Sequence, residues 1–125
     1  MSITWKYVKP LEDNNLVRAY LADHHISIPE DMISIMEKYN GGRPSDKQII
    51  TSENREYVFK SLLSYNKNDL ETIYDVYPEV FSNTSLYPIG SDAAGNFVCF
   101  DTSSKKYVFF NHETEKVETI KRMPF

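Results

Sequence analysis

Residues 86–101 read LYPIGSDAAGNFVCFD and begin the strand-rich half of the chain. Two apolar runs, 86–90 and 96–101, lie on either side of a short polar segment. The chain has only four glycines, and Gly90 and Gly95 both fall within this stretch. Because glycine adopts backbone conformations that strain other residues, these positions predict the bends through which one strand leads into the next.

Downstream of this stretch the sequence alternates short apolar runs with polar turns. The runs cover residues 106–111 and 116–120, and the turns cover residues 102–105 and 112–115. Connections this short leave no room for a crossover helix, so we expect each strand to pair antiparallel with its neighbour. The C-terminal half of the chain is therefore predicted to be a β-meander.

The best-marked helix lies upstream, over residues 29–39. Pro29 suits the start of a helix because the N–H groups of the first turn have no partner within the helix, so a residue that lacks one loses no bond there. Apolar residues recur along one face of the segment, as they do in a helix that covers a core. The run Asn40-Gly41-Gly42 follows, and these residues tolerate the left-handed conformation in which many helices end.

Apolar spacing predicts two further helices, one between Leu16 and His24 and one over residues 67–77. The second helix is expected to turn Leu70 toward the core and to end at Pro78, which cannot continue a helix. Strand-like runs with alternating or β-branched residues occupy residues 3–7, 48–51 and 57–63.

These segments together predict one α+β domain over residues 1–125, with about three helices packed on a mainly antiparallel or mixed sheet. The net charge of −4 argues against a surface built for nucleic-acid phosphates and favours a basic protein partner. No apolar run approaches the ~18 residues of a membrane span, and the N-terminus lacks the pattern of a signal peptide. We therefore expect a cytoplasmic protein that binds neither nucleic acid nor membrane.

Five short motifs follow one another along most of the chain. They are residues 28–31 (IPED), 40–44 (NGGRP), 62–66 (LLSYN), 87–96 (YPIGSDAAGN) and 108–113 (VFFNHE). In this order they resemble the SUKH superfamily, which includes fungal cell-wall synthesis regulators and bacterial immunity proteins of polymorphic toxin systems. The motif residues expected to have structural roles are Pro29, Asn40, Gly41, Gly42, Pro88, Gly90, Asp92, Gly95 and Asn96.

The resemblance implies a binding protein without catalysis and without a cofactor. Bacterial members typically bind and neutralise a cognate toxin, often a nuclease, and fungal members act as interaction hubs in growth control. Two functions therefore follow from the resemblance. One is an immunity protein that occludes a basic, nuclease-like toxin, and the other is a regulatory interaction protein with no toxin partner.

The C-terminal end of the sequence departs from the family pattern. Family members usually carry a helix after the last strand, whereas this sequence stops at residues 121–125. Either the helix is missing or the sequence is a shortened form. A missing helix would expose a face or an edge of the sheet, which favours self-association. We therefore expect a monomer or a weak homodimer.

Carboxylates at two places are candidate contacts for a basic partner. Glu71 and Asp75 lie on the outer face of the third predicted helix, and Glu113 and Glu115 lie in the last turn. Trp5 and the tyrosines are expected in the core or on the sheet face. Any of these aromatic residues that prove to be exposed together become anchor candidates, because Tyr and Trp contribute strongly to interface energetics.

Cys99 and His112 are the first candidates for catalysis. In the predicted hairpin Cys99 lies near Phe109 and His112 lies near Asn96, an offset of three residues or ~10 Å along a strand. A nucleophile must lie within hydrogen-bond reach of its base, so a buried structural cysteine is favoured. As the only cysteine, Cys99 also excludes an intrachain disulfide.

Asp92, Asp101 and Glu113 are the candidate ligands for Mg²⁺ or Ca²⁺, but they are spread over three turns and lack the spacing of a calcium loop. Asp92 is instead expected to bond backbone N–H groups of its own turn. The histidines at 24–25 and His112 do not match the spacing of a zinc site. A small metal-dependent hydrolase is therefore the third and least supported function, and no metal site is predicted.

Overall fold

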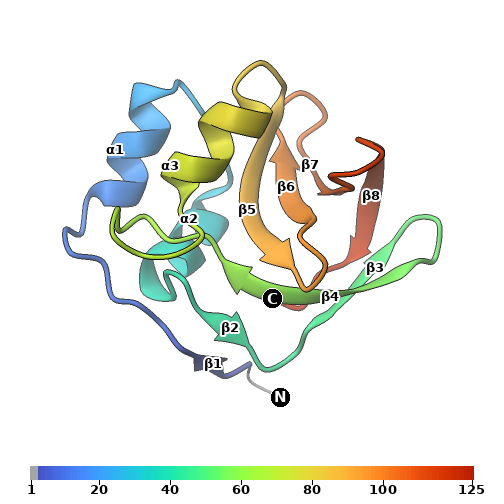
Figure 1. Ribbon diagram of the computed structural model, residues 1–125, viewed down its shortest axis with the longest axis horizontal. Coiled ribbons are helices and arrows are strands. Elements are labelled where there is room, and N and C mark those ends of the chain that lie inside the picture. The colour runs from blue at the N-terminus through green and yellow to red at the C-terminus, as the bar shows by residue number, and fades with distance from the viewer. Residues whose placement is uncertain (1–2) are drawn as a thin grey trace.

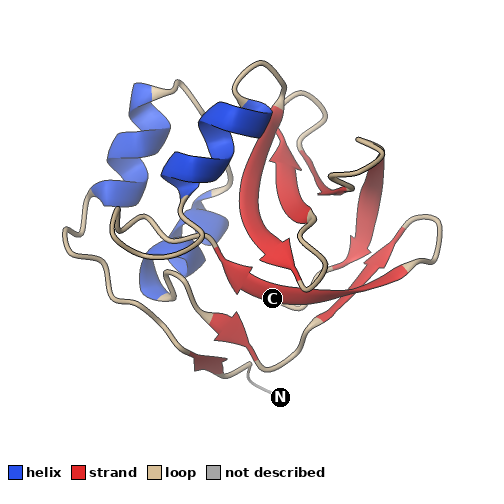
Figure 2. Cartoon of the chain, in the orientation of Figure 1, coloured by secondary structure: helices blue, strands red, loops and turns tan. Residues whose placement is uncertain are grey.

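The computed structural model describes residues 3–125 and shows the α+β fold that the sequence predicts. Helices gather on one side of the molecule and strands on the other (Figure 2). In chain order (Figure 1), the elements are β1 (Trp5–Lys6), α1 (Leu16–Asp23), α2 (Glu30–Lys38), β2 (Arg43–Pro44), β3 (Gln48–Thr51), β4 (Glu56–Leu62), α3 (Ile73–Val76), the π-helical turn η1 (Tyr77–Phe81), β5 (Leu86–Asp92), β6 (Phe97–Asp101), β7 (Lys106–Phe110) and β8 (Val117–Arg122).

The strands from β3 to β8 form a closed barrel in which every pairing is antiparallel. Each strand pairs with the next one in the sequence, and β8 returns to pair with β3, where Thr51 lies opposite Ile120. The short strands β1 and β2 form a separate ribbon. Because β8 has a partner on both sides, the expectation of an exposed sheet edge is wrong, and barrel closure covers that edge.

The segment after β8 packs on the protein without forming a helix. The ring centre of Phe125 lies 5.3 Å from that of Trp5 and 5.0 Å from that of Phe59. In Figure 1 the mark of the C-terminus accordingly overlaps β4. Phe125 thus connects the N-terminal ribbon to the barrel through aromatic contacts.

The turn between β5 and β6 confirms the predicted bend at Gly95. Gly95 has a φ of +85°, in the left-handed region that favours glycine. The carboxylate of Asp92 accepts the backbone N–H groups of Ala94 and Asn96 at 3.0 and 2.6 Å. The predicted role of Asp92 as a turn residue is therefore also confirmed.

Gly90 has a different role, because it lies inside β5 and not in the turn. A Cβ atom at this position would lie 2.5 Å from the ring of Phe59 and 2.6 Å from the carbonyl oxygen of Ser61. The β5–β6 register also shifts between Pro88 and Gly90. Glycine is required here mainly because β5 and β4 approach each other so closely.

Helix α2 confirms the best-marked helix of the sequence. It begins directly after Pro29 and ends at Lys38, within one residue of its predicted ends. Its buried residues come from the predicted apolar face and are Met32, Ile33 and Met36. Gly41 follows with a φ of +69°, so the glycine run ends the helix as expected.

The third helix begins later than predicted. Residues 67–71 form turns and bends, and the helix begins only at Ile73. Thr72 has an extended backbone that pairs in parallel with Ser64, and Glu71 has a φ of +53°. The backbone before Ile73 is therefore held by a β-bridge, and apolar spacing alone does not reveal such a bridge.

Pro78 and Leu70 also differ from the sequence-based expectation. Pro78 does not end the helix but lies near the start of η1, which continues directly from α3. Leu70 is 85% exposed, because it lies in the turn before the helix and not on the buried face. The side chains that α3 and η1 bury are Ile73, Tyr77 and Phe81.

Candidate partner-binding surface

Glu71 and Asp75, two of the predicted partner contacts, are already bonded within the protein. Glu71 forms an ion pair with Lys60 at 2.5 Å and accepts a hydrogen bond from the hydroxyl of Ser61 at 3.3 Å. The carboxylate of Asp75 accepts a hydrogen bond from the hydroxyl of Thr72 at 3.1 Å. Both residues are exposed, so each can contact a partner if it gives up these contacts within the protein.

Glu113 and Glu115 lie in a different place, on the exposed β7–β8 loop. Their loop is held against the β5–β6 turn, because the backbone N–H of His112 donates to the side-chain oxygen of Asn96 at 3.0 Å. Glu113 lies 3.9 Å from the ring of His112. Across residues 3–125, no hydrogen bond or ion pair connects this loop to Glu71 or Asp75, so the four carboxylates form two separate pairs.

Cys99 is fully buried in β6 and lies opposite Val108 of β7. Cys99 is thus one residue from the position opposite Phe109, and the predicted nearness of His112 to Asn96 is confirmed by their hydrogen bond at 3.0 Å. Lys105 has a φ of +59°, and its N–H donates to Asp101, so a tight turn sets the pairing of β6 with β7. Burial raises the pKa of the Cys99 thiol well above its ordinary value, and a protonated thiol is a poor nucleophile.

The candidate metal ligands do not converge. Asp92 is occupied by its own turn, and Asp101 accepts hydrogen bonds from the Ser85 hydroxyl and the Ser103 N–H. Glu113 lies on the loop described above. In the part of the chain that the structure describes, no group of three His, Cys, Asp or Glu side chains is close enough together to hold a metal ion.

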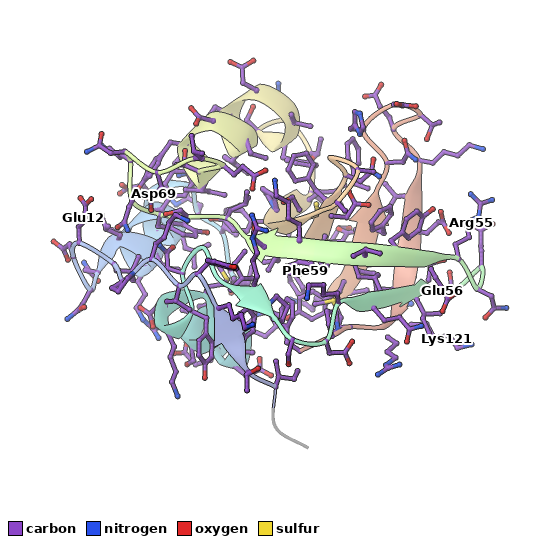
Figure 3. All side chains as sticks on the ribbon, turned by 60° about the horizontal axis from the view of Figure 1, so that its bottom comes forward. Glu12, Arg55, Glu56, Phe59, Asp69 and Lys121 are labelled. Atoms are coloured by element: carbon purple, nitrogen blue, oxygen red, sulfur yellow. The ribbon has the colours of Figure 1, made fainter. Side chains whose placement is uncertain are left out.

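A hollow that the sequence does not predict lies between the N-terminal ribbon and the barrel. We name it the Tyr7 hollow. Its volume is about 290 Å³, and its lining residues are Tyr7, Lys9, Gly41, Arg43, Lys60, Ser61, Leu62, Leu70 and Glu71. In Figure 3, which brings this side forward, β2 lies next to β4, and β1 lies on the other side of β2. The hollow therefore joins segments that are far apart in the sequence.

Tyr7 lies at the end of β1 and points out of the fold. The predicted strand 3–7 treats it as a half-buried residue, but its φ of +58° ends the strand, and its side chain is 68% exposed. The guanidinium carbon of Arg43 lies 5.4 Å from the centre of the Tyr7 ring, a distance typical of a cation–π contact. An exposed aromatic residue and an arginine thus lie side by side.

A buried polar junction lies beside this hollow, next to its lining residues Lys9 and Gly41. The side-chain amide of Asn40 donates to the carbonyl oxygen of Lys9 at 2.8 Å and to the hydroxyl of Ser64 at 3.0 Å. Its oxygen accepts the N–H of Tyr65 at 2.8 Å. Asn66 adds a bond to the carbonyl oxygen of Pro10 at 3.0 Å. The chain before α1 is therefore tied to the loop after β4.

Gly42 shows why the ribbon lies so close to this junction. A Cβ atom there would lie 2.7 Å from the carbonyl oxygen of Tyr39 and about 3 Å from side-chain atoms of Val8 and Trp5. The N–H of Leu62 donates to the carbonyl oxygen of Gly42 at 3.0 Å. The NGGRP motif thus ends α2, holds the ribbon against β4 and places Arg43 at the surface.

Comparison with known families identifies the chain. A family model described as SUKH_6, SMI1-KNR4 cell-wall, matches residues 22–122. The chain belongs to this SUKH family. The comparisons with curated proteins and with solved structures find no match. The resemblance predicted from the five motifs is therefore confirmed, and all five motifs lie inside the matched range.

The structure also shows whether any of its helices could cross a membrane. Over residues 3–125, none of the helices has both the length and the apolar character that a membrane crossing requires.

Proposed function

We propose that this SUKH protein is a cytoplasmic, non-catalytic immunity protein that binds a cognate toxin and covers its active surface. The observation that carries the proposal is the family match across residues 22–122, because the family resemblance implies toxin neutralisation for bacterial members. The buried Cys99 thiol and its raised pKa add support, since they suit a structural role better than a nucleophilic one.

Binding by occlusion suits the charge of the protein. A nuclease toxin needs cations to hold nucleic-acid phosphates, and the net charge of −4 attracts such a partner. The exposed pair Glu113 and Glu115 lies on a loop that hydrogen bonds hold in place. Carboxylates placed in this way steer a basic partner and speed the encounter.

A regulatory interaction protein with no toxin partner is the second candidate. The matched family carries a cell-wall description, and this observation favours it. The two candidates share a binding role and differ only in the partner.

The test of the first candidate uses the full chain and the C-terminal domain of the protein encoded by the adjacent upstream gene. We expect the two to co-purify, to bind with nanomolar affinity by calorimetry, and to leave the domain inactive in the complex. If the neighbourhood contains no toxin-like gene and no such domain binds, the immunity proposal is wrong and the regulatory candidate replaces it.

A pair of variants tests the acidic contacts. Glu113→Lys with Glu115→Lys should slow association by about tenfold at low salt, because local charge steers the encounter. The matched control is Asp23→Lys with Glu53→Lys, which changes the net charge equally at two other exposed positions. Equal slowing by both double variants would show that net charge alone, and not this loop, steers the toxin.

A further inference from the structure

A second hollow continues the Tyr7 hollow along the same side of the protein. It has a volume of about 490 Å³ and lies around Lys6, Ser45 and Lys47. Tyr7 and Arg43 line both hollows, so this cation–π pair lies where the two hollows adjoin. The two hollows together make one extended concave surface beside β1 and β2, which we name the Tyr7 surface.

The Tyr7 surface is basic although the protein is acidic. Its cations are Lys6, Lys9, Arg43, Lys47 and Lys60, and its only carboxylate is Glu71. The rest of the chain therefore holds nine of the 14 cations and 17 of the 18 carboxylates. Such a separation of charge favours an anionic partner at this surface alone.

Most of these cations lack a partner within the protein. Glu71 pairs with Lys60, whereas no carboxylate within residues 3–125 forms an ion pair with the other four cations of the surface. By contrast, Arg18, Arg55 and Arg122 all pair with carboxylates elsewhere in the fold. Six lysines elsewhere in residues 3–125 also form no ion pair, so this surface is distinguished by its scarcity of carboxylates and by the unpaired arginine, Arg43.

Two exposed apolar side chains lie on the same surface. Tyr7 is 68% exposed and Leu70 is 85% exposed, and both line the first hollow. Tyrosine and arginine are enriched at the centres of protein interfaces. Neither Tyr7 nor Leu70 packs into the hydrophobic core, so core packing does not explain why these two apolar side chains lie at this surface.

The two sides of the hollow also share an uncommon backbone conformation. Tyr7 and Glu71 have φ values of +58° and +53°, a region that residues other than glycine seldom occupy. The buried junction at Asn40 holds the chain on both sides of the hollow in place. The Tyr7 surface is therefore preformed, which lowers the cost of ordering it on binding.

We propose that the Tyr7 surface binds an acidic protein segment that places an apolar side chain between Tyr7 and Leu70. The cations attract the carboxylates of the segment, and the two exposed side chains supply the apolar contact. A protein is favoured over a nucleic acid because Leu70 and Glu71 in the lining of the site suit a peptide better than a phosphate backbone. The inference goes beyond the proposed function, since it does not require the partner to be a toxin.

The test uses the immobilised full chain and a phage-displayed library of random peptides of about twelve residues. We expect the enriched peptides to combine several Asp or Glu residues with an aromatic or branched apolar residue. A synthetic copy of one such peptide should shift the backbone amide signals of Tyr7, Arg43 and Leu70 in an NMR titration. Its affinity should fall as salt rises, as charge pairing requires.

Variants then assign the binding to this surface. Arg43→Glu and Leu70→Ala should each weaken the peptide by at least about tenfold, as removal of an interface anchor does. Lys116→Glu is the matched control, because Lys116 is exposed on the β7–β8 loop, and it should leave the affinity unchanged. Circular dichroism confirms that each variant is folded.

Three results would overturn the proposal. Enriched peptides without an excess of Asp and Glu, or no enrichment at all, would show that the cations of the Tyr7 surface do not select an acidic segment. Signal shifts confined to another face would place the site elsewhere. A single-stranded DNA oligonucleotide that binds the Tyr7 surface more tightly than the peptide would assign it to nucleic acid. None of these results depends on whether a toxin binds, so failure here and failure of the immunity proposal are distinguishable.

Discussion

The inner and outer sides of the NGGRP segment use their side chains in opposite ways. On the inner side, Asn40 is fully buried and its amide group bonds to three partners. On the outer side, Arg43 is exposed, and within the described chain it contacts the ring of Tyr7 but no carboxylate. One short segment thus stabilises the fold through Asn40 and contributes Arg43 to the Tyr7 surface. Substitutions should therefore separate stability from binding.

The largest loss of stability is expected for Asn40→Ala. The substitution leaves the buried N–H of Tyr65 and the part-buried carbonyl oxygen of Lys9 without their partner, and a buried unpaired group costs about 1–3 kcal/mol. We expect the free energy of unfolding in urea to fall by about 3 kcal/mol. Asn83→Ala, at an exposed turn position, is the control and should change it by less than about 0.5 kcal/mol. A loss at position 40 no larger than the control would refute the junction as a stabilising element.

Gly90→Ala should cost about 2 kcal/mol, because its methyl group would overlap the ring of Phe59 and the barrel would have to shift. Gly95→Ala should cost about 1 kcal/mol, since the space there is open and only the positive φ strains the new residue. Thermal unfolding of both variants gives the order. The reverse order would mean that backbone strain outweighs the close approach of β5 to β4.

Tyr65→Phe removes one hydroxyl from the buried side. The hydroxyls of Tyr65 and Tyr87 lie 2.5 Å apart, and burial raises the pKa of both phenols. Above about pH 10 these groups ionise in the unfolded chain but stay protonated in the fold, so stability falls as pH rises. Each contributes a slope of about 1.4 kcal/mol per pH unit there.

The variant should therefore show an alkaline slope shallower by about that amount, with a loss of about 1 kcal/mol at neutral pH from the missing hydrogen bond. Urea unfolding at a series of pH values measures both quantities. The ordinary pKa of tyrosine is about 10. If the plots of unfolding free energy against pH for the variant and the wild type are parallel above that pH, the proposed alkaline sensitivity of Tyr65 is wrong.

The smallest effect on stability is expected at the outer surface. Leu70→Ala should change the free energy of unfolding by less than about 0.5 kcal/mol, because the side chain is exposed. The matched substitution Leu62→Ala removes a buried leucine from β4 and should cost about 3 kcal/mol. If Leu70→Ala destabilised the protein as strongly as Leu62→Ala, Leu70 would belong to the fold and not to a binding surface.

Much of the fold could be predicted because its signals are local. Helix α2 has Pro29 before it, a glycine run after it and an apolar face between them. The meander from β5 to β8 alternates apolar runs with polar turns, and the structure reproduces each predicted strand to within about two residues. In both regions the residues that set the structure are neighbours in the sequence.

The features that could not be predicted depend on contacts between distant segments. Barrel closure needs Thr51 to meet Ile120, and the late start of α3 follows from the bridge between Ser64 and Thr72. The β6–β7 register depends on the geometry of a single turn, at Lys105. Apolar spacing or alternation carries no information about any of these.

The candidate site was predictable only in part. The acidic residues are exposed as expected, and their role in partner binding stays a prediction. The Tyr7 surface was missed because the alternation of residues 3–7 suggests a half-buried Tyr7, whereas a left-handed backbone at that residue turns it outward. Arg43 and Leu70 join it only after the ribbon and the loop before α3 come together.

The pairing of β8 with β3 has a consequence for synthesis on the ribosome. Strand β3 leaves the exit tunnel long before its partner β8, because the whole of β4 to β7 lies between them in the sequence. During that interval one margin of β3 has no hydrogen-bonding neighbour, and nascent chains with unpaired strands are prone to association. The strand is short and carries the polar side chains of Gln48 and Thr51, and both features lower the tendency of an unpaired strand to associate with other chains.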